Sequence, residues 1–366
     1  MELNKLGFND YFRAFFSEYE GNTETGTAML PGRIFSEHRN FYGIYTETGE
    51  LLGEISGKMR FSAKTREDYP AVGDFVAVSE RPGNEATIHA ILPRRNKFSR
   101  LAPRAGGSSK TEEQIIAANL DMVLIVTALE NDFSLRRIER YLTLAYDNEI
   151  KPLIVLSKAD LCQDLPAKIA EVESIAFGVD IVAVSSLTGY GISELKKYFL
   201  PAKTLAILGS SGVGKSTLIN MAAGCDIRKV SEVRECDGKG RHTTTSRELI
   251  TLPGGALIID TPGMRELQLW DGADGLSNLF EDIESIAAGC KFSDCTHVSE
   301  PGCAVLKALD EGVIDSGRFK SYNKMKREAA YAATQVDTRA RLEEQKKWKN
   351  IAKLVRNFSK ETRYKL

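Results

Sequence analysis

The glycine-rich stretch LGSSGVGKSTLIN, in the middle of the chain, constrains the fold more than any other feature. It contains the spacing Gly209-x4-Gly214-Lys215-Ser216, with an apolar run before it and a run of helical spacing after it. Glycines at these positions let the backbone curl, so that several N–H groups point at one anion, and the N-terminus of the helix adds its positive end. The stretch therefore predicts a P-loop, the phosphate-binding turn between a buried strand and a helix.

P-loop chemistry assigns a role to several side chains. Lys215 is expected to reach the β- and γ-phosphates of a nucleotide and to act in catalysis, and the Ser216 hydroxyl is expected to coordinate Mg²⁺. Asp260 ends an apolar run and is expected to hold the same Mg²⁺ through water, while Gly263 offers its backbone N–H to the γ-phosphate. The residues of the loop expected to bind the nucleotide are Gly209, Ser210, Ser211, Gly212, Val213, Gly214, Lys215, Ser216 and Thr217.

Two segments before the P-loop favour guanine as the base. The segment VLSKAD contains Ser157, Lys158 and Asp160, close to the GTPase motif Asn-Lys-x-Asp, in which the Asp accepts hydrogen bonds from a donor pair that adenine lacks. Ser157 replaces the Asn that normally braces this loop. The segment VSSLTG resembles the loop whose backbone N–H groups contact the guanine O6, here through Ser186 and Leu187. An ATP-using P-loop enzyme that acts on RNA is the alternative.

The stretch GKGRHTTTSREL lies between the P-loop and Asp260, where a GTPase has its first switch. It shows neither helical nor strand alternation. A threonine in this position binds Mg²⁺ and the γ-phosphate while GTP is bound. Thr244 is the candidate for this catalytic and metal-binding role, and Thr243 and Thr245 are the alternatives.

His242, in the same stretch, is the candidate for positioning the attacking water. Many GTPases use a glutamine just after the Asp-x-x-Gly motif, but Met264 stands there and cannot do so. We therefore expect slow intrinsic hydrolysis that a partner activates. The alternative role for His242 is a contact with RNA or a structural one within the loop.

The segment before the P-loop core predicts a small β-barrel of the OB type, because five short strands fit into about seventy residues. Basic and aromatic residues interleave here, which suits stacking on bases and contact with phosphates. The alternative is an ordinary barrel with Phe inside and Arg outside. The predicted strands are 28–35, 41–46, 51–56, 74–78 and 86–92. The basic and aromatic residues are Arg33, Phe35, Arg39, Phe41, Tyr42, Lys58, Arg60, Phe61, Arg94, Arg95, Lys97, Phe98 and Arg100.

After a flexible connector, strands alternate with helices, which predicts a parallel sheet covered on both faces. A helix is predicted at 134–147. The predicted strands are 121–128, 153–156, 181–185, 204–208 and 256–260. From about residue 275 onward the chain is predicted to be helical and polar.

A cysteine and histidine cluster lies inside this helical part. The spacing Cys290-x4-Cys295-x-His297-x5-Cys303 supplies three thiolates and an imidazole within 14 residues. This ligand set suits one tetrahedral Zn²⁺, and four protein ligands leave no open position, so a structural zinc site is expected. The alternative is a set of free buried cysteines with a surface histidine.

Charge and hydropathy narrow the partners. Between Arg318 and Leu366 the chain has 15 Lys or Arg against 5 Asp or Glu, although the net charge of the whole chain is −1. Such a basic tail favours a polyanionic partner, and a solvated helix is the alternative. There is no apolar run long enough to cross a bilayer and no signal peptide, so we expect a cytoplasmic protein with no membrane partner. No DNA partner is expected, and a monomer is the default expectation, because the sequence does not reveal the oligomeric state.

The order of the motifs points to one family. Ordinary GTPases begin with the P-loop, whereas here both guanine-reading segments precede it, as in a circularly permuted core. With a barrel before it and a zinc cluster after it, the chain resembles the RsgA family of small-ribosomal-subunit-dependent GTPases. LPRRNKFSR, IAANLD and GRHTTT also resemble that family.

The resemblance implies an α/β P-loop GTPase core, circularly permuted, with an N-terminal OB-like β-barrel and a C-terminal helical zinc-binding module. It further implies that GTP hydrolysis is stimulated by the small ribosomal subunit, that the barrel and zinc modules dock on its rRNA, and that the role is late subunit maturation with release of assembly factors. A nucleotide-gated RNA-binding scaffold with incidental hydrolysis is the alternative. The expected parts are 1–103 for the OB-fold RNA-binding domain, 104–112 for a linker, 113–274 for the GTPase domain, 275–330 for the zinc-binding domain and 331–366 for a basic helical extension.

Overall fold

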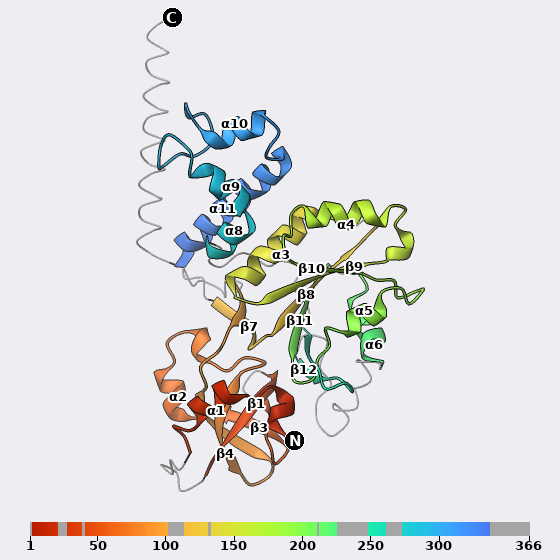
Figure 1. Cartoon of the computed structure of the whole chain (residues 1–366). Helices are drawn as coiled ribbons and strands as arrows, with labels where there is room; N and C mark the ends of the chain where they lie inside the picture. The colour runs from red at the N-terminus through yellow and green to blue at the C-terminus, as the bar shows by residue number, and fades with distance from the viewer. Residues whose placement is uncertain are drawn as a thin grey trace, which may run out of the picture.

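The computed structural model describes residues 2–20, 28–38, 41–101, 113–130, 133–210, 212–224, 248–260 and 273–336. Figure 1 shows three parts in a row, with a barrel at the N-terminal end, an α/β part in the middle and a helical module beyond it. Among the helices in those ranges, none is long and apolar enough to span a bilayer.

The N-terminal part is a closed five-stranded barrel, as predicted. β1 pairs with β2 and β4, β3 pairs with β2 and β5, and β4 with β5 completes the ring. The β3–β5 pair is parallel and the other pairs are antiparallel. Alternate side chains such as Ile34, Ile44 and Ile88 fill the barrel and are fully buried. The strands are β1 (Met29–Glu37), β2 (Tyr42–Tyr45), β3 (Glu50–Ile55), β4 (Phe75–Arg81) and β5 (Glu85–Ile91).

Two short helices, α1 (Asp10–Phe16) and α2 (Gly57–Ser62), belong to the barrel part of the chain. α1 places the ring of Phe12 against that of Phe75, with 4.2 Å between ring centroids. α2 begins where the Ser56 hydroxyl accepts a hydrogen bond from the Met59 backbone N–H. The 3-10 turns of the chain are η1 (Leu3–Leu6), η2 (Arg66–Asp68) and η3 (Ala159–Leu161).

The middle part is a sheet with the order β10-β9-β8-β11-β13-β12, as part of a longer sheet. Five neighbouring strands are parallel and β12 is antiparallel at the end. The chain runs outward from β8 to β10 and then returns to β11 on the other side of β8. The carboxyl end of β11 therefore lies at the switch point of the sheet, where ligands of such folds bind. The strands are β8 (Met122–Ala128), β9 (Lys151–Ser157), β10 (Asp180–Ala183), β11 (Thr204–Leu208), β12 (Glu248–Thr251) and β13 (Leu257–Asp260).

Helices cover both faces of this sheet, as the alternation of strands and helices predicted (Figure 1). On one face the apolar side of α3, including Ile138 and Leu142, packs in the same core as α4. On the other face Leu195 of α5 and Leu218 of α6 share a second core. The helices are α3 (Leu135–Asp147), α4 (Leu165–Glu173), α5 (Ile192–Lys196) and α6 (Lys215–Ala223).

A separate hairpin joins the barrel to the sheet. β6 (Lys97–Leu101) pairs with β7 (Glu113–Ala118) in antiparallel fashion, from Lys97 opposite Ala118 to Leu101 opposite Glu113. The expected linker at 104–112 lies between these paired strands and outside the described residues.

The C-terminal part is helical, as predicted, and it docks on α3. Gly275 approaches α3 so closely that its backbone N–H donates to Asp147 Oδ1 at 2.6 Å, and a Cβ there would lie 2.3 Å from the Thr143 carbonyl oxygen. The helices are α8 (Ala273–Leu279), α9 (Glu281–Ala287), α10 (Ala304–Asp310) and α11 (Ser316–Val336).

Arg33 of β1 joins the barrel to the α/β part. Its side chain is 1 % exposed, and its guanidinium donates to Thr204 Oγ1 at 2.9 Å, to the Gly73 carbonyl at 3.3 Å and to the Leu6 carbonyl. Burial lowers the pKa of Arg33 to about 9, with the charge of Asp121 opposing the shift, so the side chain stays protonated at neutral pH. The expectation that Arg33 contacts RNA at the barrel surface is wrong, because its donors are used inside the molecule.

Candidate functional site

The P-loop has the backbone conformation that its glycines predicted. Gly209, Gly212 and Gly214 have φ values of 150°, 83° and 90°. A Cβ on Gly209 would lie 2.4 Å from the carbonyl oxygen of Val126 in β8, so no larger residue fits there. Cβ atoms on Gly212 and Gly214 would meet nothing within 4 Å, so these two positions favour glycine because of their positive φ and not because of close packing.

Lys215 is the first residue of α6, and its side chain curls over the loop. Its Nζ donates to the carbonyl oxygens of Gly209 at 2.8 Å and Ser210 at 2.6 Å. Ser216 and Thr217 follow in the first helical turn, where backbone N–H groups have no partner within the helix. The arrangement brings a cation, the backbone amides of the first helical turn and the hydroxyl groups of Ser216 and Thr217 to one end of α6, and these groups fit a nucleotide phosphate with Mg²⁺.

The two guanine-reading segments lie at the same edge of the sheet as the P-loop. Ser157 ends β9 and Lys158 follows in a left-handed conformation with φ 56°. The Ala159 backbone N–H donates to the Val184 carbonyl at 3.0 Å, which holds the segment against the one that follows β10. Asp160 and Leu187 are exposed and Ser186 is half-buried, so none of the three is enclosed in the core.

Ser157 also connects the guanine side to the phosphate side. Its side chain is 1 % exposed, and its hydroxyl lies 2.8 Å from the carbonyl oxygen of Val213 in the P-loop and 3.2 Å from that of Thr127 in β8. The bracing role expected of an Asn at this position is thus carried by a shorter hydroxyl side chain.

Other predicted site residues are placed only in part. Asp260 is the last residue of β13, which pairs in parallel with β11, so its backbone lies beside the P-loop. Ser211, His242, Thr244 and Gly263 lie outside the described residues.

Sequence reasoning missed one contact of the P-loop. Arg137, near the start of α3, donates from Nη1 to Ser210 Oγ at 2.5 Å. The signal available in the sequence was the Arg136-Arg137 pair at the start of a predicted helix, but nothing local showed that this helix faces the P-loop.

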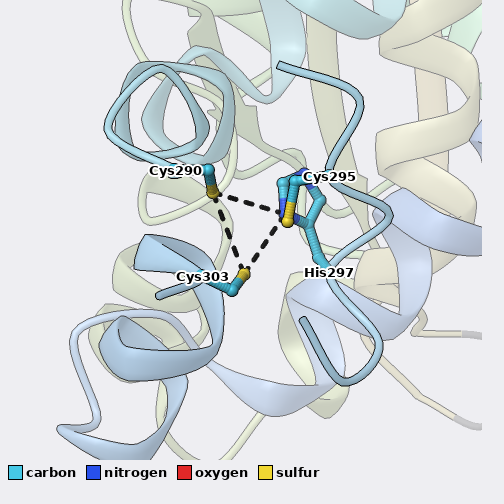
Figure 2. Close-up of side chains that lie close together, drawn as sticks. All are labelled: Cys290, Cys295, His297 and Cys303. Carbon is cyan, nitrogen blue, oxygen red and sulfur yellow. Dashed lines mark hydrogen bonds between the residues drawn. The ribbon is translucent and has the colours of Figure 1, made fainter. Parts of the chain in front are cut away.

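The four predicted zinc ligands come together in the C-terminal module (Figure 2). Their ligand atoms all lie within 4.8 Å of one another. Cys290 Sγ lies 3.8 Å from Cys303 Sγ and 3.7 Å from His297 Nδ1, which is itself 3.4 Å from Cys303 Sγ. A tetrahedron of thiolate and imidazole ligands around Zn²⁺ has edges of about 3.5–3.8 Å, so the group fits one zinc ion.

The surroundings of the cluster shift the pKa values of its ligands in different directions, and burial raises the pKa of Cys295 to about 11. Burial lowers the pKa of His297, which favours the neutral imidazole that binds metal. The pKa of Cys290 is also lowered: burial opposes the shift, but backbone N–H groups of Val305 and Ala304, at the start of α10, outweigh it. When bound, zinc would tie the loop after α9 to the start of α10.

Glu300 holds the loop that carries His297. Its carboxylate accepts hydrogen bonds from the backbone N–H groups of Thr296 and Val298, both at 2.9 Å, and of Ser299 at 3.0 Å. Hydrogen bonds from Thr296 and from these amides hold the pKa of Glu300 well below its usual range. His297 itself has φ 58°, so this loop fixes a left-handed residue at the cluster.

The barrel surface keeps only part of the expected RNA-binding group. Phe61 is 93 % exposed and Phe41 is 39 % exposed, which leaves both rings accessible for stacking. Arg94 is instead fixed by a two-point ion pair with the buried carboxylate of Asp74, at 2.7 and 2.8 Å. Lys97 is paired with Glu67.

Comparisons with known proteins agree with this architecture. A family model described as RsgA GTPase matches residues 91–270, and a model described as 50S ribosome-binding GTPase matches residues 204–362, starting at the first residue of β11. The crystal structure of YjeQ from Thermotoga maritima is similar with a TM-score of 0.59 and 30% identity, covering 82% of this chain and 98% of that one. YloQ, described as a circularly permuted GTPase, is similar with a TM-score of 0.57 and 25% identity, covering 84% and 98%.

Curated relatives cover almost the whole chain. A protein of Opitutus terrae named small ribosomal subunit biogenesis GTPase RsgA is 44% identical over 96% of this chain and 96% of its own length. One from Lactiplantibacillus plantarum, RsgA 2, is 47% identical over 83% of this chain and 84% of its own length. With this identity and coverage, and with the permuted order of its motifs, the chain belongs to the RsgA family of circularly permuted GTPases.

Proposed function

We propose that this GTPase hydrolyses GTP to GDP and phosphate under stimulation by the small ribosomal subunit, late in the assembly of that subunit. The observation that carries the proposal is the Ser157–Val213 contact, which joins a guanine-reading segment to a P-loop at one edge of the sheet. The same chain carries a barrel with exposed rings and a four-ligand metal cluster. Relatives named small ribosomal subunit biogenesis GTPase supply the partner.

The roles proposed for the site residues follow from the sequence motif in which each one stands. Lys158, Asp160 and the backbone at Ser186 and Leu187 bind the guanine, and the loop from Gly209 to Thr217 with Gly263 binds the phosphates. Bound Mg²⁺ neutralises charge that develops on the phosphates. Ser216, Thr244 and Asp260 hold the ion, Lys215 and Thr244 act on the γ-phosphate, and His242 positions the water.

The segment between β13 and α8 connects the nucleotide site to the C-terminal module, so a change at the bound nucleotide can be transmitted to that module along the chain. β13 ends at Asp260, beside the P-loop, and the next described element is α8 of the C-terminal module. We propose that the GTP form binds the subunit's rRNA through the barrel and the zinc module, and that hydrolysis releases the protein together with assembly factors. The protein is proposed to act in the cytoplasm as a monomer, without a DNA or membrane partner, with domains at 1–103, 113–274 and 275–330.

The decisive experiment measures GTP turnover by the full-length, zinc-loaded protein with and without purified small subunits. The proposal predicts slow turnover alone and a large increase with subunits, with none in a Lys215→Ala variant. Turnover that subunits do not change would contradict it. Labelled GTP that excess ATP displaces would instead indicate an ATP-using enzyme.

Two further variants separate hydrolysis from scaffolding. A His242→Ala variant is expected to bind GTP but to lose the subunit-stimulated increase, and full stimulated turnover would remove the proposed role of His242. Cells that mature small subunits normally with a hydrolysis-deficient variant would indicate a nucleotide-gated scaffold instead.

A further inference from the structure

A strongly basic cleft of about 460 Å³ lies between α3 of the GTPase core and α11 of the C-terminal module. Gly317 lets the Arg136 guanidinium pack against α11, because a Cβ there would lie 2.2 Å from one of its nitrogens. The cationic side chains that line the cleft are Arg136, Arg137, Arg140, Lys320 and Lys324.

Acidic neighbours neutralise only part of this charge. Arg136 pairs with the buried carboxylate of Glu139 at 3.1 Å, and Arg140 pairs with Glu328 at 2.5 Å. Lys320 and Lys324 are exposed, stand one helical turn apart on the same side of α11, and have no acidic partner in the part of the chain described here. The cleft therefore keeps a positive field at its mouth.

The floor of the cleft is rigid. Glu139 accepts hydrogen bonds from Arg318 at 3.3 Å and from the Ser321 hydroxyl at 2.6 Å, and Arg318 also forms a two-point pair with Asp282, both contacts at 2.8 Å. These contacts tie α3 to α11 and α9. Because the walls are held in this way, the backbones of the two helices that carry the five cations are tied to each other rather than free to move independently.

The cleft also adjoins the nucleotide site. Arg137 lines it and donates to Ser210 Oγ of the P-loop at 2.5 Å. An anion bound in the cleft would therefore lie near the P-loop, because Arg137 contacts both the cleft and Ser210 of that loop.

We propose that this cleft binds backbone phosphates of the small subunit's RNA; this rests on the function proposed above. Exposed lysines on one side of a helix suit phosphate oxygens, which they contact as point charges without reading the base. An open groove between two helices suits a continuous polyanion, which places several charges along it. The sequence after α11 is also positively charged, with 10 Lys or Arg against 4 Asp or Glu after residue 336.

The test uses the full-length, zinc-loaded protein and purified small subunits with a non-hydrolysable GTP analogue. A Lys320→Gln, Lys324→Gln double variant is expected to bind subunits about ten-fold more weakly. Since each lost phosphate contact lowers the dependence of log K on log salt by about one, the slope should fall by about two. A Lys320→Arg, Lys324→Arg variant should restore both.

The matched control is Lys196→Gln, Lys197→Gln, which removes two exposed charges at the C-terminal end of α5, on the opposite face of the sheet. Its affinity should stay close to that of the wild type. Unchanged affinity and slope in the α11 variant would overturn the proposal, and so would a loss of affinity without a change in slope, which would indicate a protein contact.

The outcomes separate this proposal from the proposed function. Wild-type protein that binds subunits without faster hydrolysis, together with weaker and less salt-dependent binding by the α11 variant, would contradict stimulated hydrolysis and support the cleft. If subunits stimulate hydrolysis by the wild-type protein but the α11 variant binds them as tightly as the wild type, stimulated hydrolysis is supported and RNA binding by the cleft is contradicted. Wild-type protein that does not bind subunits at all would overturn both.

Discussion

At the scale of single residues, Ser157 shows how a departure from a motif is accommodated. Its hydroxyl braces the P-loop carbonyl of Val213 at 2.8 Å. A Ser157→Ala variant leaves that buried carbonyl without this donor, so binding of GTP and GDP should weaken about 3- to 10-fold. Titration with a fluorescent nucleotide measures the change. Ser174→Ala, which removes an exposed hydroxyl, is the control, and equal affinities in both variants would refute the bracing role.

Glu300 provides a second test at the same scale, now at the metal cluster. Its carboxylate binds the amides around His297, so Glu300→Gln should loosen the ligand loop and weaken zinc binding about 10- to 100-fold. Transfer of zinc to a chromophoric chelator gives the affinity. Glu311→Gln, which changes an exposed carboxylate at the opposite end of α10 from Cys303, should leave the zinc affinity unchanged. Equal zinc retention by the two variants would show that Glu300 does not position His297.

Arg33 marks where residue-level prediction fails. The motifs at the P-loop and the zinc cluster could be predicted, because their chemistry depends on spacing along the chain. Arg33 lies among aromatic residues in a strand, a pattern that equally fits a surface contact with RNA. Its partners Leu6 and Thr204 are 27 and 171 residues away, so only the folded chain brings them to its guanidinium.

At the scale of helices and strands, the contact of α8 with α3 depends on one glycine. Gly275→Ala would place a methyl group 2.3 Å from the Thr143 carbonyl, a backbone atom that cannot rotate away. The variant should lose about 1–3 kcal/mol of stability, measured by urea unfolding. Gly254→Ala, where a Cβ would meet nothing within 4 Å, should cost far less. A similar loss in both would show that α8 adjusts without cost.

Prediction at this scale succeeded where periodicity was long enough. The spacing of apolar residues predicted α3, and buried runs predicted the parallel strands. The short β12 and the hairpin of β6 and β7 were missed, because four to six residues carry little pattern and strand pairing is not visible in the local sequence.

At the scale of the whole molecule, Arg33 holds the barrel on the GTPase core. Arg33→Met would leave the carbonyls of Gly73 and Leu6 without this donor, at a cost of about 1–3 kcal/mol. Urea unfolding should detect this loss, and small-angle scattering should detect a wider range of barrel positions. Arg60→Met, an exposed arginine of α2, is the control. Unchanged stability and scattering would show that the barrel is held by other contacts.

The sheet of the GTPase core does not end at β12, since β1 of the barrel lies beside it with Ser36 opposite Glu248. A strand with an unpaired side offers its amides and carbonyls to any passing chain, and a barrel has no such side. The barrel therefore covers the Glu248 end of this edge strand, a part of the sheet where another chain could otherwise pair. A core cut free of its barrel would expose that surface, and self-association would then accompany any loss of activity.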